Sequence, residues 1–454
     1  MTQELSLQQG EQLLTGWGRT APSLAQVVPC TSTAEVQEAV RTAGPRGVLV
    51  RGLGRSYGDA AQSGGARVLD LQSINSIDYD AEAGLVTAGA GASLDAVMRT
   101  IVPLGAFVPV TPGTRMITVG GAIGADVHGK NHHVDGTFGA HVRQLSLVDG
   151  NGELRELNPD DSTSAQFWTT IGGMGLTGAM TSACFDVIPI ETSRMSVDTK
   201  RVDDLEEVMA HMVTGDSKYR YTVAWIDTVS ASGRGIITSG DHASLDQLSD
   251  KQRSTARAFA PKALASAPNL FPPGLLNKLT VKAFNEAWFR RAPQDRAGEI
   301  QSIGAFFHPL DGVQNWNRVY GPGGFLQYQF VVPDSASELV RVALDRLRGI
   351  SAPSFLTVLK RFGEANPAPL SFPKTGWTLA ADVPAGLPGL GTVLDELDDL
   401  VADAGGRLYL AKDSRQSPQM FARTYPRLGE WQKIRDELDP RGVFTSDLAR
   451  RLSI

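Results

Sequence analysis

The chain has 454 residues, of which 42% are hydrophobic and 20% are charged. Its length suggests two or three domains of roughly 150 residues each, and its composition excludes disorder, collagen and coiled coil as descriptions of the whole chain. The net charge of −6 argues against a basic nucleic-acid-binding surface, so we expect no nucleic-acid partner. Cys30 and Cys184 are too few for a disulfide framework or a four-thiolate zinc site, and we expect both to be buried small hydrophobic residues.

We expect no targeting signal in the N-terminal segment of this sequence. MTQELSLQQGEQ is polar and acidic, whereas a signal peptide is basic and then apolar. No run of about 18 apolar residues could span a bilayer. We therefore expect a protein of the cytoplasm that touches a membrane at most peripherally.

The first 190 residues combine short strands, helices and glycine-rich loops. Ser32 and Glu35 resemble a capping box that opens a short helix, and Ser93 opens another. Three short apolar runs predict strands, at 47–51, 68–71 and 85–88. Residues 144–157 predict a hairpin closed by an Asp-Gly-Asn-Gly turn. We interpret residues 1–190 as one α+β domain.

The C-terminal half has the element order β-α-β-β-α-β, the split-βαβ pattern. Strands are predicted at 325–332, 354–361, 376–383 and 407–412, and amphipathic helices at 335–348 and 390–404. This order predicts a mostly antiparallel sheet with helices on one face and the other face free to cover a site. Gln327 and Gln329 share one face of their strand. They are either solvent-facing or, if that face covers a ligand, orienting hydrogen-bond groups.

Glycine is enriched early in the chain: 24 of the 48 glycines fall within residues 44–178. Glycine loses more backbone freedom on folding than any other residue, so local enrichment needs a compensating reason. A turn-rich β domain is one reason, and a backbone cradle for a large anionic cofactor is another. Three stretches carry most of the enrichment, at 51–59, 111–133 and 171–180.

The stretch RGLGRSYGD at 51–59 is not a Rossmann fingerprint, because G-x-G-x-x-G would need glycine where the chain has Tyr57. A strand that runs into a glycine-rich turn nevertheless directs backbone N–H groups into a concavity that suits a pyrophosphate. Three such loops in one domain favour a dinucleotide that lies extended across it.

His128 and His132 have the spacing of metal ligands on a helix. The glycines around them argue against a helix and no third ligand is evident, so we expect no metal. A histidine that donates to a cofactor or substrate is the favoured interpretation. Lys360 and Lys412 lie near the ends of neighbouring predicted strands, where a lone lysine is usually a solvated charge.

Residues 251–291 form a basic excursion with eight lysines and arginines and a single acid, Glu286, interleaved with Phe, Leu and Trp. Two interpretations are open. The segment is either a solvated, flexible excursion, or a lid or membrane-surface patch that attracts an anionic lipid by charge and by apolar insertion.

Eight motifs occur in one order along the chain: RGLGRSYGD, TPGTR-x-x-TVGGAI, HGKNHH, GLTG, HPLD, GFLQYQF, PLSFP-x-x-GW and AKDSR. With them, residues 15–453 resemble the decaprenylphosphoryl-β-D-ribose 2-oxidases. These flavoproteins are one half of the epimerase that makes decaprenylphosphoryl arabinose for cell-wall arabinan. The resemblance implies a two-domain α+β fold of the vanillyl-alcohol-oxidase type. Residues 1–190, completed by 407–454, would bind FAD, and residues 191–406 would form an antiparallel-sheet substrate domain.

The resemblance also implies roles for individual residues. FAD would be bound non-covalently by Arg51, Gly52, Leu53, Gly54, Arg55, Ser56, Tyr57, Gly58, Asp59, Gly113, Thr118, Val119, Gly120, Gly121, Ala125, Asp126, Val127, His128 and Tyr409. The substrate pocket would be lined by Lys130, Arg318, Gln327, Gln329, Lys360 and Asp382. Lys412 and His128 are the implied catalytic residues. Lys412 would place a positive charge beside the flavin, and either Lys412 or His128 would take the hydroxyl proton.

Three positions depart from the family pattern. Phe307 replaces a tyrosine, Thr378 replaces an asparagine, and Ala380 stands where some members carry a thiol. The first two changes alter fine substrate contacts. The third predicts that inhibitors that work by thiol capture form no adduct with this chain.

The activity implied by the resemblance is oxidation of the C2 hydroxyl of a polyprenylphosphoryl ribofuranose to the 2-keto product. A separate NADH-dependent reductase would complete the epimerisation, and the location would be either cytoplasmic and membrane-associated or periplasmic. One alternative is a sugar-alcohol or aldonolactone oxidase on the same fold. Another is a flavin-binding scaffold or electron carrier, against which the HGKNHH and AKDSR clusters argue.

Overall fold

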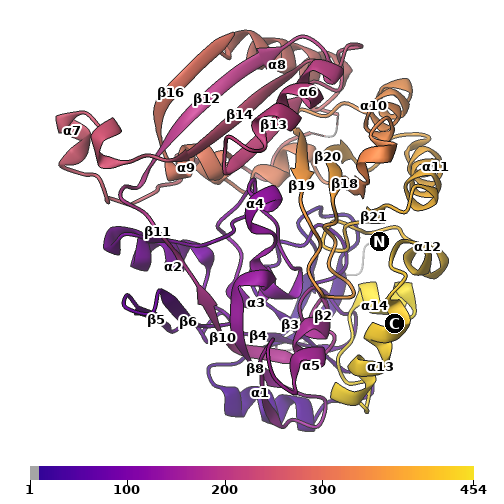
Figure 1. Cartoon of the computed structure of the whole chain (residues 1–454). Coiled ribbons are helices and arrows are strands. Elements are labelled where there is room, and N and C mark those ends of the chain that lie inside the picture. Colours follow the sequence, from indigo (N-terminus) through magenta and orange to yellow (C-terminus); the bar gives the residue numbers. More distant parts are fainter. Residues whose placement is uncertain (1–9, 273) are drawn as a thin grey trace.

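The structure is a computed structural model that describes residues 10–272 and 274–454 (Figure 1). Residues 1–9, which hold most of the polar N-terminal segment, lie outside the described residues. A large sheet forms one end of the molecule, smaller sheets form the other end, and the C-terminal helices lie alongside the smaller sheets (Figure 1). None of the helices described in this structure is long and apolar enough to cross a membrane.

A four-stranded sheet opens the chain. Its order is β1 (Glu11–Leu14), β2 (Ser23–Pro29), β4 (Arg67–Asp70) and β3 (Val48–Arg51), with β1 antiparallel and the other neighbours parallel. Helix α1 (Thr33–Arg41) packs against this sheet. Ser32 caps the helix as predicted, since its Oγ accepts the N–H of Glu35. The Glu35 carboxylate accepts the N–H of Thr31, so the reciprocal half of the capping box is absent.

A five-stranded antiparallel sheet follows. Its order is β5 (Ile77–Asp80), β6 (Leu85–Gly89), β10 (Ala179–Asp186), β8 (Val142–Val148) and β9 (Leu154–Leu157). The predicted hairpin is therefore confirmed as β8–β9. Around the sheet lie α2 (Leu94–Ile101), α3 (Val119–Gly124), α4 (His132–Asp135), α5 (Ser164–Thr170) and the short pair β7 (Ala106–Phe107) and β11 (Ile188–Pro189).

Strand alternation corrects one expectation about the cysteines. Cys30 is buried, but Cys184 is half-buried on β10, because its neighbours Ala183 and Phe185 face the core and Cys184 faces the other side.

The large sheet has eight strands, all paired antiparallel. Its order is β16 (Asp295–Ser302), β12 (Arg194–Val202), β14 (Gly235–His242), β13 (Tyr221–Ile226), β19 (Thr357–Phe362), β20 (Gly376–Pro384), β18 (Phe325–Val332) and β21 (Arg407–Leu408). The antiparallel sheet predicted for 325–412 is confirmed as its second half.

The two halves of this sheet repeat one connectivity. The first half runs β12-α6-β13-β14-α8-β16 and the second runs β18-α10-β19-β20-α11-β21. In both, the fourth strand lies beside the first, and the third lies between the first and the second. The halves meet where β13 pairs with β19, so the order reads symmetrically from the centre of the sheet. The split-βαβ unit therefore occurs twice, and the sequence predicted only the second copy.

The faces of the large sheet differ. Helices α6 (Leu205–Gly215), α10 (Leu339–Gly349) and α11 (Leu390–Asp403) bury one face in a shared apolar core. Helix α8 (Lys278–Arg291) lies over the opposite, inner face, where Arg201 of β12 donates to carbonyls at the C-terminal end of α8. Short elements border this face: α7 (Asp250–Arg253), β15 (Ala265–Ser266), α9 (Ile303–Phe307) and β17 (Val313–Gln314).

The C-terminal segment returns to the first half of the chain through α12 (Pro418–Thr424), α13 (Leu428–Leu438) and α14 (Asp447–Leu452). The Trp431 indole N–H donates to the carbonyl of Thr169, and the Val48 N–H of β3 donates to the carbonyl of Val443. Segments far apart in the sequence thus share one core.

Several element boundaries differ from the prediction; the strand expected at 354–361, for example, is Thr357–Phe362. The strand expected at 407–412 ends at Leu408, and the next residues form a turn in which the Lys412 N–H donates to the carbonyl of Tyr409. The helix expected from residue 335 begins at Leu339, after a short 3-10 turn. The turn matters because it brings Lys412 to the inner face.

Candidate active site

A cavity of about 1420 Å³ lies between the glycine-rich loops and the inner face of the large sheet. Small-molecule sites typically measure roughly 300–1,000 Å³, so this cavity has room for a dinucleotide together with a substrate. Residues 50–57 and 111–118, together with Gly120 and Gly121, form one wall. Gln327, Gln329 and Lys360 face them from the sheet, as expected from strand alternation.

The loop after β3 presents unpaired amides. Within the described chain, the backbone N–H groups of residues 53–56 donate to no acceptor, whereas the Ser56 carbonyl accepts the N–H of Trp17 and the Tyr57 N–H donates to the carbonyl of Ala411. Gly54 has φ +62°, which a side chain would strain. Successive free N–H groups in such a turn form a concavity that binds an anion.

Two glycines bring backbone close to the cavity. A Cβ on Gly52 would lie 2.3 Å from Oγ1 of Thr118, which accepts the N–H of Gly121 and so caps α3. A Cβ on Gly113 would meet no atom of the described residues within 4 Å, although Gly113 lines the cavity. The first glycine permits close packing of two loops, and the second leaves space that a ligand can fill.

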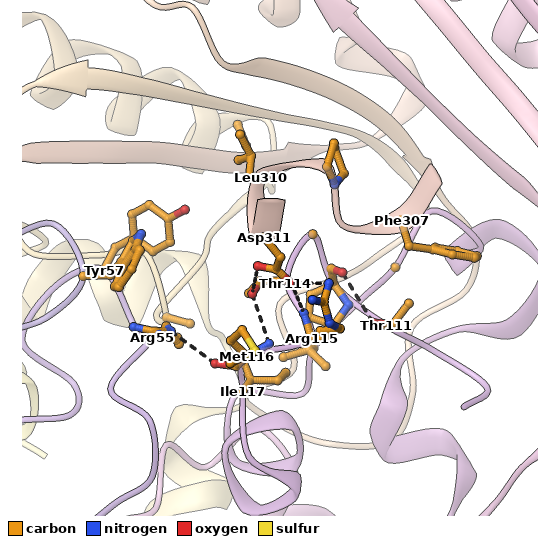
Figure 2. A pocket seen from close by; sticks show the side chains of 18 of the residues that line it. Arg55, Tyr57, Thr111, Thr114, Arg115, Met116, Ile117, Phe307, Leu310 and Asp311 are labelled. Atoms are coloured by element: carbon orange, nitrogen blue, oxygen red, sulfur yellow. Dashed lines mark hydrogen bonds and ion pairs between the residues drawn. The ribbon is translucent and has the colours of Figure 1, made fainter. Parts of the chain in front are cut away.

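Loops from the two halves of the chain are tied together at the edge of the cavity (Figure 2). The Asp311 carboxylate accepts Thr114 Oγ1 at 2.6 Å and the Arg115 N–H at 2.9 Å, and burial raises the pKa of this carboxyl. The Arg55 Nε donates to the carbonyl of Met116 at 3.2 Å. Residues 308–311 therefore fix loop 111–116 against the cavity.

His128 lies at the centre of the site. Its Nδ1 is 3.2 Å from Lys360 Nζ, and its Nε2 is 3.1 Å from the side-chain amide of Gln329. Burial, and then the charge of Lys360, hold the pKa of this imidazole well below its usual value. The Lys360 ammonium and the Gln329 amide nitrogen are both donors, and a neutral imidazole accepts at one nitrogen, so only one of these two contacts is a hydrogen bond to the ring.

Lys412 and Asp382 form a second pair of titratable groups. Lys412 Nζ lies 3.6 Å from the centroid of the Tyr57 ring. Burial lowers the pKa of Lys412 to about 7, against the opposing charge of Asp382. Burial also raises the pKa of Asp382, which accepts a hydrogen bond from Gln327. Its other carboxylate oxygen is buried and has no hydrogen-bond partner among the residues that the structure describes. Perturbed pKa values in a cleft mark a candidate functional site.

Lys130 and Lys360 add two more buried cations. Lys130 Nζ donates to the carbonyl of Phe306 at 2.6 Å and lies 4.2 Å from the centroid of that ring. Burial lowers the pKa of Lys130 to about 7 and that of Lys360 to about 8. Neither ammonium forms an ion pair with a carboxylate in the described part of the chain, so the site favours an anionic ligand.

Most of the residues expected at the site line the cavity. They are Arg51, Gly52, Leu53, Gly54, Arg55, Ser56, Tyr57, Gly113, Thr118, Gly120, Gly121, Ala125, Val127, His128, Tyr409, Lys130, Gln327, Gln329, Lys360 and Lys412. Their individual roles in binding stay predictions.

Six of the expected residues do not border the cavity: Gly58, Asp59, Val119, Asp126, Arg318 and Asp382. Asp59 pairs with Arg451 through two bonds of 2.8 Å, and Val119 is buried in the core. Asp126 accepts a hydrogen bond from Asn366, and Arg318 donates to the carbonyl of Ala267. We expect these residues to support the site without direct ligand contact.

Sequence reasoning missed the apolar wall that α8 contributes. Phe284 and Trp288 line the cavity and stack at 6.2 Å with an angle of 9° between their rings. Their spacing of four residues is the available signal, since residues i and i+4 share one face of a helix. Two of the three departures from the family pattern line the cavity, which therefore has no tyrosine hydroxyl at Phe307 and no thiol at Ala380. The third, Thr378, does not line the cavity, and its Oγ1 accepts a hydrogen bond from Gln329.

Comparisons with known proteins agree with this geometry. A family model described as FAD binding domain matches residues 24–158, and a model described as D-arabinono-1,4-lactone oxidase matches residues 389–452. The chain is 45% identical to decaprenylphosphoryl-β-D-ribose oxidase of Mycolicibacterium smegmatis over 449 residues, 97% of each chain. It is 23% identical to L-gulono-1,4-lactone dehydrogenase of Mycobacterium tuberculosis over 95% of this chain and 96% of the relative. It is 24% identical to alditol oxidase of a Streptomyces species over 97% of this chain and 98% of the relative.

The fold and the site define an FAD-dependent oxidoreductase of the vanillyl-alcohol-oxidase type that acts on a CH–OH group. The free amides of residues 53–56 and the open space at Gly113 fit the pyrophosphate of FAD. The chain belongs to the decaprenylphosphoryl-β-D-ribose oxidase family, which confirms the resemblance seen in its motifs.

Proposed function

We propose that this protein oxidises the C2 hydroxyl of decaprenylphosphoryl-β-D-ribofuranose to the 2-keto product, the first half of epimerisation to decaprenylphosphoryl arabinose for cell-wall arabinan. One observation carries the proposal: His128, Lys130, Lys360 and Lys412 meet at the inner face of the sheet, opposite the loops that fit FAD. A flavin electron carrier has no need of such a cluster.

In this proposal residues 1–190 and 407–454 bind FAD non-covalently, and residues 191–406 cover it with the inner face of the large sheet. The 2-keto product would pass to a separate NADH-dependent reductase. Residues 251–291 would contact a membrane from its surface, because the segment carries exposed leucines among basic side chains and also contributes Phe284, Trp288 and Arg291 to the cavity.

The chemistry divides between the cofactor and the chain. When bound, FAD supplies the two-electron oxidant that takes the hydride from C2. Lys412 accepts the hydroxyl proton in its neutral form, and the neighbouring Asp382 carboxylate stabilises the ammonium that results. His128 stays neutral and orients the hydroxyl, and its ring is held in place between Lys360 and Gln329.

The second candidate function is that of an oxidase for sugar alcohols or aldonolactones on the same fold. It is tested as well, because two more distant relatives are named for such substrates. The first function is favoured because the buried Lys130 and Lys360, which pair with no carboxylate of residues 10–272 and 274–454, suit a substrate that carries a phosphate.

The test compares flavin bleaching by farnesylphosphoryl-β-D-ribose, by xylitol and by L-gulono-1,4-lactone. We expect bleaching by the ribose lipid alone. Lys412→Met should keep its bound FAD and reduce the bleaching rate at least about 100-fold, the usual lower bound for loss of a general base. Bleaching by xylitol or the lactone, with none by the ribose lipid, would replace this function by the second one.

A further inference from the structure

The cavity continues past the lysines into an apolar cleft. One wall is the inner face of the first half of the sheet, with Val223 and Trp225 of β13 and Ile236 of β14. The opposite wall is α8, with Phe284 and Trp288. None of the catalytic groups proposed above lies in this cleft.

The cleft is built by specific contacts of α8. Asn285, which is fully buried, donates to the Asp227 carboxylate at 2.7 Å and to the carbonyl of Ser354 at 3.2 Å. The Arg234 guanidinium lies 4.2 Å from the centroid of the Phe289 ring. Because one helix side is fixed by buried polar bonds, the other side presents Phe284 and Trp288 to the cavity.

Lys130 and Lys360 lie where the cleft meets the catalytic cluster. The Lys130 carbonyl accepts the N–H of Thr222, which places Lys130 beside β13. Trp225 of β13 pairs with Val358, two residues before Lys360 on β19. The charge of Lys360 further lowers the pKa of Lys130, as expected for two neighbouring cations that lack an acid between them.

We propose that Lys130 and Lys360 bind the phosphodiester of the substrate and that the cleft between α8 and strands β13 and β14 binds the first isoprenyl units of its lipid. The assignment rests on the proposed function for the position of the ribose, at His128 and Lys412. An anion bound between the two ammonium groups offsets their mutual repulsion. With the phosphodiester at this point, the polyisoprenyl chain attached to it extends into the apolar cleft, where its burial is favourable.

Farnesyl phosphate tests the subsite without any oxidation, because it has the phosphate and the isoprenyl units but no ribose. Its binding to the FAD-loaded protein is measured by calorimetry, with inorganic phosphate as the headgroup control. We expect farnesyl phosphate to bind at least about tenfold more tightly than phosphate, a difference of roughly 1.4 kcal/mol. Equal affinities would overturn the assignment of the cleft.

Variants separate the two parts of the subsite. Phe284→Ala with Trp288→Ala should weaken farnesyl phosphate about tenfold and leave phosphate unchanged, whereas Lys130→Met should weaken both ligands. Leu154→Ala, on an exposed strand of the smaller sheet, is the matched control and should change neither. An unchanged farnesyl phosphate affinity in the aromatic double variant would overturn the cleft, and an unchanged phosphate affinity in Lys130→Met would overturn the phosphate site.

Turnover distinguishes failure of the subsite from failure of the proposed function. For ribose substrates with one, two or three isoprenyl units, kcat/KM should rise with chain length in the wild type and rise less in the aromatic double variant. Oxidation of all three substrates with the same kcat/KM would contradict the assignment of the cleft to the lipid and leave the proposed function intact. Tight binding of farnesyl phosphate without oxidation of any ribose substrate would contradict the proposed function and leave the assignment of the cleft intact.

Discussion

The site is defined by three lysines whose pKa values are lowered by burial. Lysine normally has a pKa near 10.4, and desolvation disfavours its charged form. Burial lowers the pKa of Lys130 and Lys412 to about 7 and that of Lys360 to about 8. Each lysine therefore changes charge close to neutral pH, where it can exchange a proton or respond to an anion.

The titration of Lys412 gives a pH prediction. Its pKa of about 7 means that the amine is protonated below pH 7 and free to accept a proton above it. We expect kcat/KM for the ribose lipid to rise as Lys412 becomes neutral near pH 7, and to fall above about 8, where Lys360 as well as Lys130 has lost the charge that attracts the phosphate. The profile is measured by stopped-flow bleaching of the flavin.

Lys412→Arg is the matched variant for that profile, because arginine keeps a cation and does not titrate in this range. We expect its kcat/KM to drop at least about 100-fold and to lose the rise near pH 7. An arginine variant with the wild-type profile would assign the rise to another group. Flavin content is the control for intact cofactor binding.

Part of the site could be predicted from local pattern. Alternation along residues 325–332 placed Gln327 and Gln329 on one face, and that face lines the cavity. The contact of His128 with Lys360 could not be predicted this way, because 232 positions separate them in the sequence and only the tertiary fold joins them. The family resemblance supplied these residues as a set, and their geometry came from the structure.

At the element scale, the second copy of the split-βαβ unit was predictable and the first was not. Its elements follow one another within 325–408, and the apolar positions of α11 repeat at helical spacing. In the first copy, β14 and β16 both pair with β12, but the basic excursion separates these two strands in the sequence and hides the pattern. The strand predicted at 407–412 is wrong beyond Leu408. The alternating pattern of RLYLAK could not reveal that the chain turns there and that the Tyr409 hydroxyl donates to the distant carbonyl of Ala125.

The loop after β3 gives a prediction at this scale. In Gly52→Ala, the new Cβ would lie 2.3 Å from Thr118 Oγ1, so the cap of α3 and the loop that presents the free amides must both shift. We expect the purified variant to retain less than about a tenth of the wild-type flavin, and we expect loss of the cap to lower stability by about 1 kcal/mol. Flavin absorbance per protein and thermal unfolding measure the two effects.

Gly44→Ala is the control for that variant. Gly44 is exposed, and a Cβ there meets no atom within 4 Å. We expect full flavin content. If Gly52→Ala also retains full flavin, the loop is not the part of the chain that binds the pyrophosphate.

At the scale of the whole molecule, the cavity entrance and the basic excursion share one side. The Leu264 N–H donates to the carbonyl of Gly312, and β15 pairs with β17, so the excursion is joined to the loop that borders the cavity. Leu264, Leu270 and Leu279 are 89%, 87% and 76% exposed. Exposed leucines among basic residues suit insertion into an anionic surface, from which a lipid substrate could enter the cleft directly.

Vesicle binding checks this orientation. Each basic residue near an anionic surface contributes about 1 kcal/mol, and burying a leucine contributes roughly 1.5–3 kcal/mol. We therefore expect the protein to float with phosphatidylglycerol vesicles and not with phosphatidylcholine vesicles, and to lose most of that binding when Leu264, Leu270 and Leu279 are changed to serine. The variant should keep its flavin and its affinity for farnesyl phosphate, because these three side chains do not line the cavity.

Leu13→Ser with Leu154→Ser, two exposed leucines on the smaller sheets, is the control. Equal flotation of both variants would place the membrane contact elsewhere on the molecule.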